Sequence, residues 1–154
     1  MSEVISSHAL LEMWQGNRRL TRRVIEAFPE KELFEFSVGG MRPFAALVKE
    51  LLAIAVPGLG EMVEGEVNPL SEDLQVGSKA ELLKLWDEAT EGIDTLWTRI
   101  TPERFQETIN LFGQYEGTVL SSIIYFIENE IHHRGQGYVY LRALDIQPPF
   151  FWER

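Results

Sequence analysis

Residues 127–137 read Ile-Glu-Asn-Glu-Ile-His-His-Arg-Gly-Gln-Gly, a run of amide, carboxylate, imidazole and guanidinium groups inside an apolar helical pattern. The surrounding segment, from about Thr118 to Leu144, is the longest and most apolar helix that the sequence predicts. We therefore expect it to be the central element of a helical bundle. Its expected apolar stripe consists of Leu120, Ile124, Ile127, Ile131 and Tyr138. Polar groups that face a bundle interior are costly unless they are paired, so these residues are a candidate functional site.

The first half of the chain predicts two further helices. The first runs from about Ser7 to Phe28, because apolar residues recur there at three- and four-residue spacing. Residues 30–42 contain a Gly-Gly pair and are typical of a connection. The second helix begins at Pro43 and runs to Val56. Its continuation to Met62 stays open, because one proline and two glycines lie in that stretch.

The remaining predicted helix runs from the capping box Ser78-Lys-Ala-Glu81 to Ile100. Residues 103–117 then form a long structured loop between the third and fourth helices, with an extended piece at 105–111 as an alternative to irregular structure. The aromatic tail, residues 148–152, is expected to pack on the bundle or on a second subunit, because its exposure to water would be costly. Together these segments predict an all-α four-helix bundle, in one domain that spans residues 1–154.

Composition excludes several functional classes. The formal charge of −10 opposes the phosphate backbone of nucleic acid, and no apolar run is long enough to span a membrane. The N-terminal residues lack the basic leader of a signal peptide, so a cytoplasmic location is expected. There is no cysteine, so thiol chemistry would need an external thiol. Helical spacing places Arg18, Arg19, Arg22 and Arg23 on a solvated outer face.

Within the last helix, polar side chains share one strip. A rotation of about 100° per residue places these on a common face: Phe126, Asn129, His133, Gln136 and Tyr140. Glu130 lies on the other side of His133, also toward the interior, whereas Glu128 and His132 point outward. A lone interior histidine is more often a hydrogen-bonded core residue than a metal ligand. The accumulation of polar groups keeps the alternative of a metal or ligand site open.

Residues 129–136, Asn-Glu-Ile-His-His-Arg-Gly-Gln, resemble the signature of the DinB/YfiT-like superfamily. In that signature a His-x-x-x-His pair precedes Arg-Gly-Gln on the last helix of the bundle. The resemblance implies a four-helix bundle of up-down-down-up topology, commonly homodimeric, with a divalent metal held by three histidines. Some members are transferases or isomerases that use a low-molecular-weight thiol.

By this resemblance, His133 stands at the position of the second motif histidine, and Asn129 stands at the position of the first. Glu50 stands at the position of the family's histidine ligand on the second helix. The only other histidines are His8 and His132, so the usual triad cannot form. Glu50 and His133 remain suitable ligands for zinc, nickel or manganese, and Asn129 is a weaker oxygen donor. Glu130 is an alternative ligand, and Gln136 a further site residue. An altered metal site and a lost one both stay open.

The resemblance implies a metal-assisted transferase that joins an external thiol to a small electrophile, with no catalytic residue assigned. The alternative is a non-enzymatic stress-response or small-molecule-binding bundle in which the polar strip is a hydrogen-bond network. For the Arg-Gly-Gln segment, we expect Arg134 to pair with an acid on a neighbouring helix or subunit. Gly135 is expected to permit close helix packing, and Gln136 to contribute to folding specificity.

Overall fold

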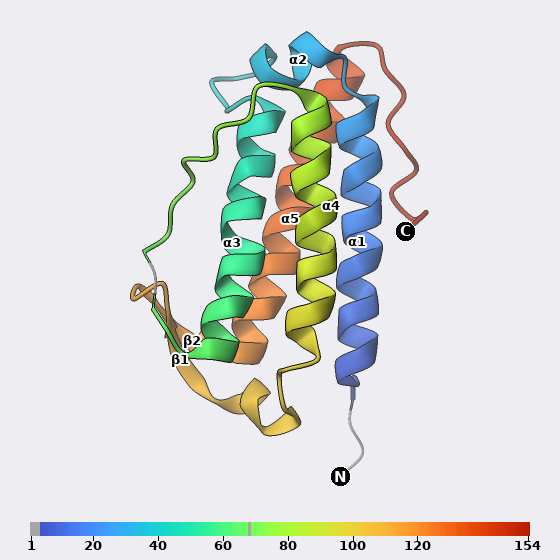
Figure 1. Cartoon of the computed structure of the whole chain (residues 1–154). Helices are drawn as coiled ribbons and strands as arrows, with labels where there is room; N and C mark the ends of the chain where they lie inside the picture. The colour runs from blue at the N-terminus through green and yellow to red at the C-terminus, as the bar shows by residue number, and fades with distance from the viewer. Residues whose placement is uncertain (1–3, 68) are drawn as a thin grey trace.

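The computed structural model describes residues 4–67 and 69–154, and the long helices of this part form a bundle (Figure 1). They are α1 (Ser7–Ala27), α3 (Phe44–Glu64), α4 (Lys79–Trp97) and α5 (Val119–Ala143). Figure 1 shows α1 and α5 running in one direction, and α3 and α4 running in the other. Both α1 and α3 pack against α4 and against α5. The predicted all-α bundle is confirmed.

Short elements occupy the connections. Residues 30–42, predicted as a plain connection, include the helix α2 (Glu30–Glu35). The predicted loop at 103–117 contains most of the 3-10 helix η1 (Pro102–Gln106) and of an antiparallel hairpin formed by β1 (Thr108–Leu111) and β2 (Tyr115–Thr118). The extended piece proposed at 105–111 is therefore correct for β1, and the second strand was missed. A single hairpin cannot bury its own faces, so it packs on α3 and α5.

Side-chain caps mark the starts of α4 and α5. The Ser78 hydroxyl accepts a hydrogen bond from the Glu81 N–H at 3.2 Å, as the capping box predicted, and Thr118 caps α5 in the same way. The second predicted helix does continue beyond Val56, because α3 runs through Pro57 to Glu64. Pro57 is exposed, so its ring lies on the solvent side of α3. The third predicted helix ends at Trp97, earlier than Ile100.

Two glycines allow α3 and α5 to approach closely. A Cβ atom on Gly137 would lie 2.6 Å from the Phe44 ring, and one on Gly58 would lie 2.6 Å from the Phe126 ring. Either substitution would require the facing ring to move. The prediction that Gly135 permits close packing is wrong, because Gly135 is exposed and a Cβ there would meet no atom within 4 Å.

The predicted apolar stripe of α5 was out of phase with the buried face. Ile127 is buried as expected, but Ile124 and Ile131 are 38% and 43% exposed. The interior side of α5 instead carries these residues: Val119, Ser122, Ile123, Phe126, Ile127, Asn129, Glu130, His133, Arg134, Gly137, Tyr140 and Leu141. Polar residues thus make up a large part of the buried face of α5, while two isoleucines of the predicted stripe face solvent.

The C-terminal segment lies beside α1 (Figure 1). Arg23 of α1 donates to the Glu153 backbone oxygen at 3.1 Å, and Pro148 is buried. The aromatic rings are less well covered than predicted, because Phe151 and Trp152 remain 67% and 63% exposed. In the described residues, no helix combines the length and the apolarity needed to cross a bilayer.

Candidate functional site

The three predicted ligands Glu50, Asn129 and His133 meet between α3 and α5. His133 Nε2 lies 3.0 Å from Glu50 Oε1, and Asn129 Nδ2 donates to the same oxygen at 3.2 Å. Asn129 and His133 are one helical turn apart on the buried face of α5, so both reach Glu50 on the facing helix. The His133 and Glu50 side chains are 9% and 14% exposed. Glu50 and His133 thus face each other in direct contact.

Further groups hold this cluster in place. The Gln136 amide oxygen lies 2.8 Å from His133 Nδ1, so Gln136 does belong to the site. Arg42, immediately before Pro43, forms a hydrogen-bonded ion pair with Glu50 Oε2. The Arg42 backbone oxygen in turn accepts from the Tyr140 hydroxyl at 2.8 Å. Arg42 and Tyr140 thus connect the start of α3 to the end of α5.

These contacts decide the charge state of Glu50. Burial alone would raise the pKa of its carboxyl group, but hydrogen bonds from Arg42, His133 and Asn129 outweigh burial and lower the pKa to about 2. Glu50 is therefore an anion at neutral pH. Its Oε1 faces Asn129 and His133, and its Oε2 is bonded to Arg42.

A cavity of about 380 Å³ opens on the other side of Glu50. Its walls come from α3, the segment after α3, the hairpin and α5. Among the described residues, Glu50 both lines the cavity and contacts His133, whereas His133 does not line the cavity. This volume lies within the range of ~300–1,000 Å³ that is typical of small-molecule sites.

A model of the DinB family matches residues 1–152. The chain belongs to the DinB family. A DinB-like protein from Bacillus subtilis has a similar fold, with a TM-score of 0.74 and 22% identity over 94% of this chain and 99% of that one. One from Bacillus cereus has a TM-score of 0.76 and 14% identity, over 93% and 95%. No curated protein matches.

In this DinB-family chain the donor set does not fit the three-ligand metal centre that the resemblance implies. Catalytic zinc sites use three protein ligands, whereas Glu50 and His133 supply only two strong ones. The Arg42 guanidinium already neutralises the Glu50 carboxylate and would repel a divalent cation. Within residues 4–67 and 69–154, no group of three or more His, Asp, Glu or Cys side chains is placed to hold a metal ion.

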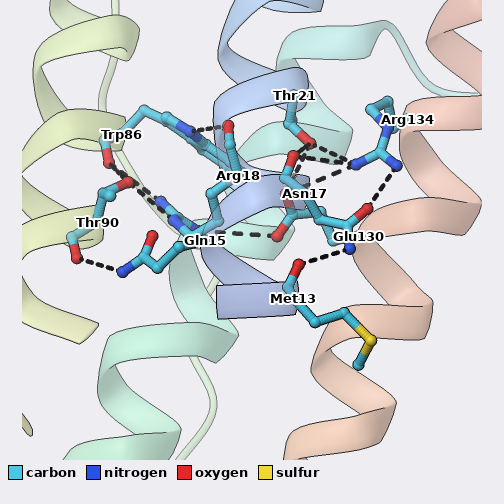
Figure 2. Close-up of polar contacts among 9 residues, drawn as sticks. All are labelled: Met13, Gln15, Asn17, Arg18, Thr21, Trp86, Thr90, Glu130 and Arg134. Carbon is cyan, nitrogen blue, oxygen red and sulfur yellow. Dashed lines mark hydrogen bonds and ion pairs between the residues drawn. The ribbon is translucent and has the colours of Figure 1, made fainter. Parts of the chain in front are cut away.

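Glu130, the predicted alternative ligand, belongs to a different cluster (Figure 2). It is 2% exposed and faces α1, where its Oε1 accepts from the Thr21 hydroxyl at 2.7 Å. Arg134 of α5 donates to Asn17 Oδ1 at 2.8 Å and lies 4.0 Å from Glu130. Arg134 therefore forms its ion pair with an acid on its own helix. The prediction had placed that acid on a neighbouring helix or subunit.

Arg18 completes this buried cluster and corrects the prediction of a solvated arginine face. Arg19 is exposed, but Arg18 is only 1% exposed. Its Nε donates to Thr90 Oγ1 at 2.9 Å, its Nη2 donates to the Trp86 backbone oxygen at 3.0 Å, and its Nη1 lies 3.9 Å from Glu130. Figure 2 shows Arg18 between α4 and α5. Burial lowers the pKa of Arg18 to about 10, so the guanidinium stays charged at neutral pH.

Sequence reasoning missed Arg42, Glu72 and Glu116. Glu72 and Glu116 line the cavity, and Arg42 contacts Glu50 and lies 3.7 Å from Glu72. The sequence held one signal for Arg42. It directly precedes Pro43, which begins the second helix, and it lies about two helical turns before Glu50. The two glutamates lie in segments without helical periodicity, so no pattern placed them near Glu50.

Proposed function

We propose that this DinB-family protein binds a small molecule in the cavity between α3, the hairpin and α5, with Glu50 as a fixed anion in the wall. One observation carries the proposal: an apolar cavity of suitable volume is joined to a carboxylate whose orientation is set by Arg42, His133 and Asn129. Such a carboxylate can orient a ligand without rearranging when the ligand binds.

Thermal denaturation in the presence of a panel of metabolites tests this proposal. Ligand at about 100 times its Kd stabilises the folded state by ~2.7 kcal/mol, which raises the Tm of a domain this size by several degrees. Ser121→Phe should abolish the increase, because Ser121 lines the cavity and is exposed, so the added ring would enter the cavity mouth. The matched control Ser121→Ala should retain it. An equal Tm increase in Ser121→Phe would contradict binding at this cavity.

Metal-assisted transfer of a low-molecular-weight thiol stays a prediction. The convergence of Glu50, Asn129 and His133 supports it, whereas the two-ligand donor set and the bound Arg42 oppose it. Calorimetric titration of stripped protein with zinc, nickel and manganese, with His133→Ala as the comparison, tests it. Metal binding that requires His133 would restore the enzymatic hypothesis. Binding that is absent, or unchanged in the variant, would defeat its metal step.

Homodimerisation, a cytoplasmic location and a role in stress response also stay predictions. The exposed apolar side chains of α5 support the first, because Ile124, Tyr125, Ile131 and Val139 would bury apolar area in an interface. Analytical ultracentrifugation of the wild-type protein and of Ile131→Glu tests it. We expect a dimer that the glutamate weakens. A wild-type monomer at micromolar concentration would contradict the prediction.

A further inference from the structure

The charged side chains around the cavity are mostly of one sign. Three carboxylates line it: Glu50 from α3, Glu72 from the segment that follows, and Glu116 from β2. None of the described lining residues is a lysine, arginine or histidine. Arg42 behind the wall compensates Glu50 and lies near Glu72, but Glu116 has no ion-pair partner in the described part of the chain. The three carboxylates and Arg42 by themselves sum to a formal charge of −2.

Aromatic rings supply much of the remaining wall. Phe112 and Tyr115 come from the hairpin, and Tyr125 and Phe126 come from α5. The two tyrosines are each 54% exposed, whereas Phe112 and Phe126 are buried. The hairpin that carries Phe112 is fixed to α3, because the buried Glu61 carboxylate accepts from the Phe112 N–H at 2.9 Å. The aromatic wall is thus partly held in place before any ligand binds.

We propose that this cavity selects an organic cation, an amine that carries an aromatic or other apolar body. This inference rests on the proposed function and specifies its ligand class. The apolar body would lie against the buried rings, and the ammonium group would face the carboxylates. A cation within ~6 Å of a ring face is also attracted by the ring quadrupole, so the aromatic and acidic walls favour the same ligand.

Other ligand classes fit the cavity less well. A carboxylate or phosphate ligand would be repelled by the net negative charge that remains at the cavity after Arg42 compensates Glu50. A thiolate would meet the same repulsion, because nearby negative charges disfavour the ionised thiol. A neutral apolar molecule could contact the rings but would make no charge interaction with Glu116, which has no ion-pair partner among the described residues.

Three compounds with a common body and different charge test the inference: 2-phenylethylamine, 2-phenylethanol and 3-phenylpropanoate. Each is titrated into the full-length protein and followed by calorimetry and by amide NMR shifts. We expect the amine to bind tightest and the acid weakest, with shifts at Gly117, Ser121 and Ser122. Added salt should weaken only amine binding appreciably, because charge attraction is screened.

Glu116→Gln separates charge selection from shape. We expect it to raise the Kd of the amine about two- to fivefold, the change typical of one partly exposed ion pair, and to leave the Kd of the alcohol unchanged. Glu128→Gln is the matched control, because Glu128 is exposed on α5 and does not line the cavity. It should alter neither value.

Several results would overturn the inference. They are equal or tighter binding of the alcohol or the acid, shifts that fall outside the cavity, and no amine binding at millimolar concentration. In the first case small-molecule binding would still stand, and only the ligand class would be wrong. The metabolite panel with Ser121→Phe judges the proposed function separately, so the failure of one can be distinguished from the failure of both.

Discussion

Glu50→Gln should destabilise the protein at neutral pH and have almost no effect in strong acid. The substitution keeps the shape of the side chain but removes the charge that Arg42, His133 and Asn129 stabilise. The pKa of Glu50 is lowered in the folded state from 4.5 to about 2. A carboxyl group with a lowered pKa stabilises the fold above its unfolded-state pKa, and this stabilisation is lost as the pH falls from about 4.5 to about 2.

The size of the effect follows from the pKa and from solvent exposure. Each pKa unit corresponds to ~1.36 kcal/mol, so the lowering of the Glu50 pKa sets an upper bound of about 3 kcal/mol. Arg42 is 47% exposed, and solvent screening weakens its share. We therefore expect Glu50→Gln to lower the free energy of unfolding at pH 7 by about 1–2 kcal/mol.

Urea denaturation of both proteins between about pH 7 and pH 2 measures this difference. The two unfolding free energies should converge across the acid range. Glu64→Gln is the control, because Glu64 forms only a surface ion pair with Arg99, with both side chains more than half exposed. It should change stability by less than ~1 kcal/mol. A Glu50→Gln protein as stable as wild type at pH 7, or a difference that persists at pH 2, would refute the assigned contacts.

Two further predictions concern the buried face of α5. Arg18→Met should cost about 3–5 kcal/mol in urea denaturation, because Glu130 would remain buried without its closest cation; a loss below ~1 kcal/mol would contradict a charged cluster. Gly137→Ala should cost about 1–3 kcal/mol because its Cβ meets the Phe44 ring. The exposed Gly135→Ala should instead gain up to ~1 kcal/mol from helix propensity, and equal effects of the two substitutions on Tm would contradict the packing described.

Local signals in the sequence predicted the bundle helices well. The capping box at Ser78 located the start of α4 because its hydrogen bonds involve only neighbouring residues. The phase of α5 could not be predicted in this way. Its buried face includes Glu130 and Arg134, whose partners Thr21 and Asn17 lie more than 100 positions earlier in the chain. Periodicity placed Glu130 toward the interior but could not name its partner, and the apolar residues alone gave a stripe that includes the exposed Ile124 and Ile131.

The contacts of the candidate site were likewise predictable only in part. Asn129 and His133 were predictable because a separation of four residues places both on one helix face. Their relation to Glu50 came from the resemblance. The contact that determines the chemistry, from Arg42 to Glu50, joins residues on either side of the start of α3, and no periodicity includes it. This contact leaves Glu50 fully engaged by protein donors on the His133 side, whereas Glu116 forms no ion pair with any residue that the structure describes. A cationic ligand therefore gains more from Glu116 than from Glu50, whose charge Arg42 already compensates.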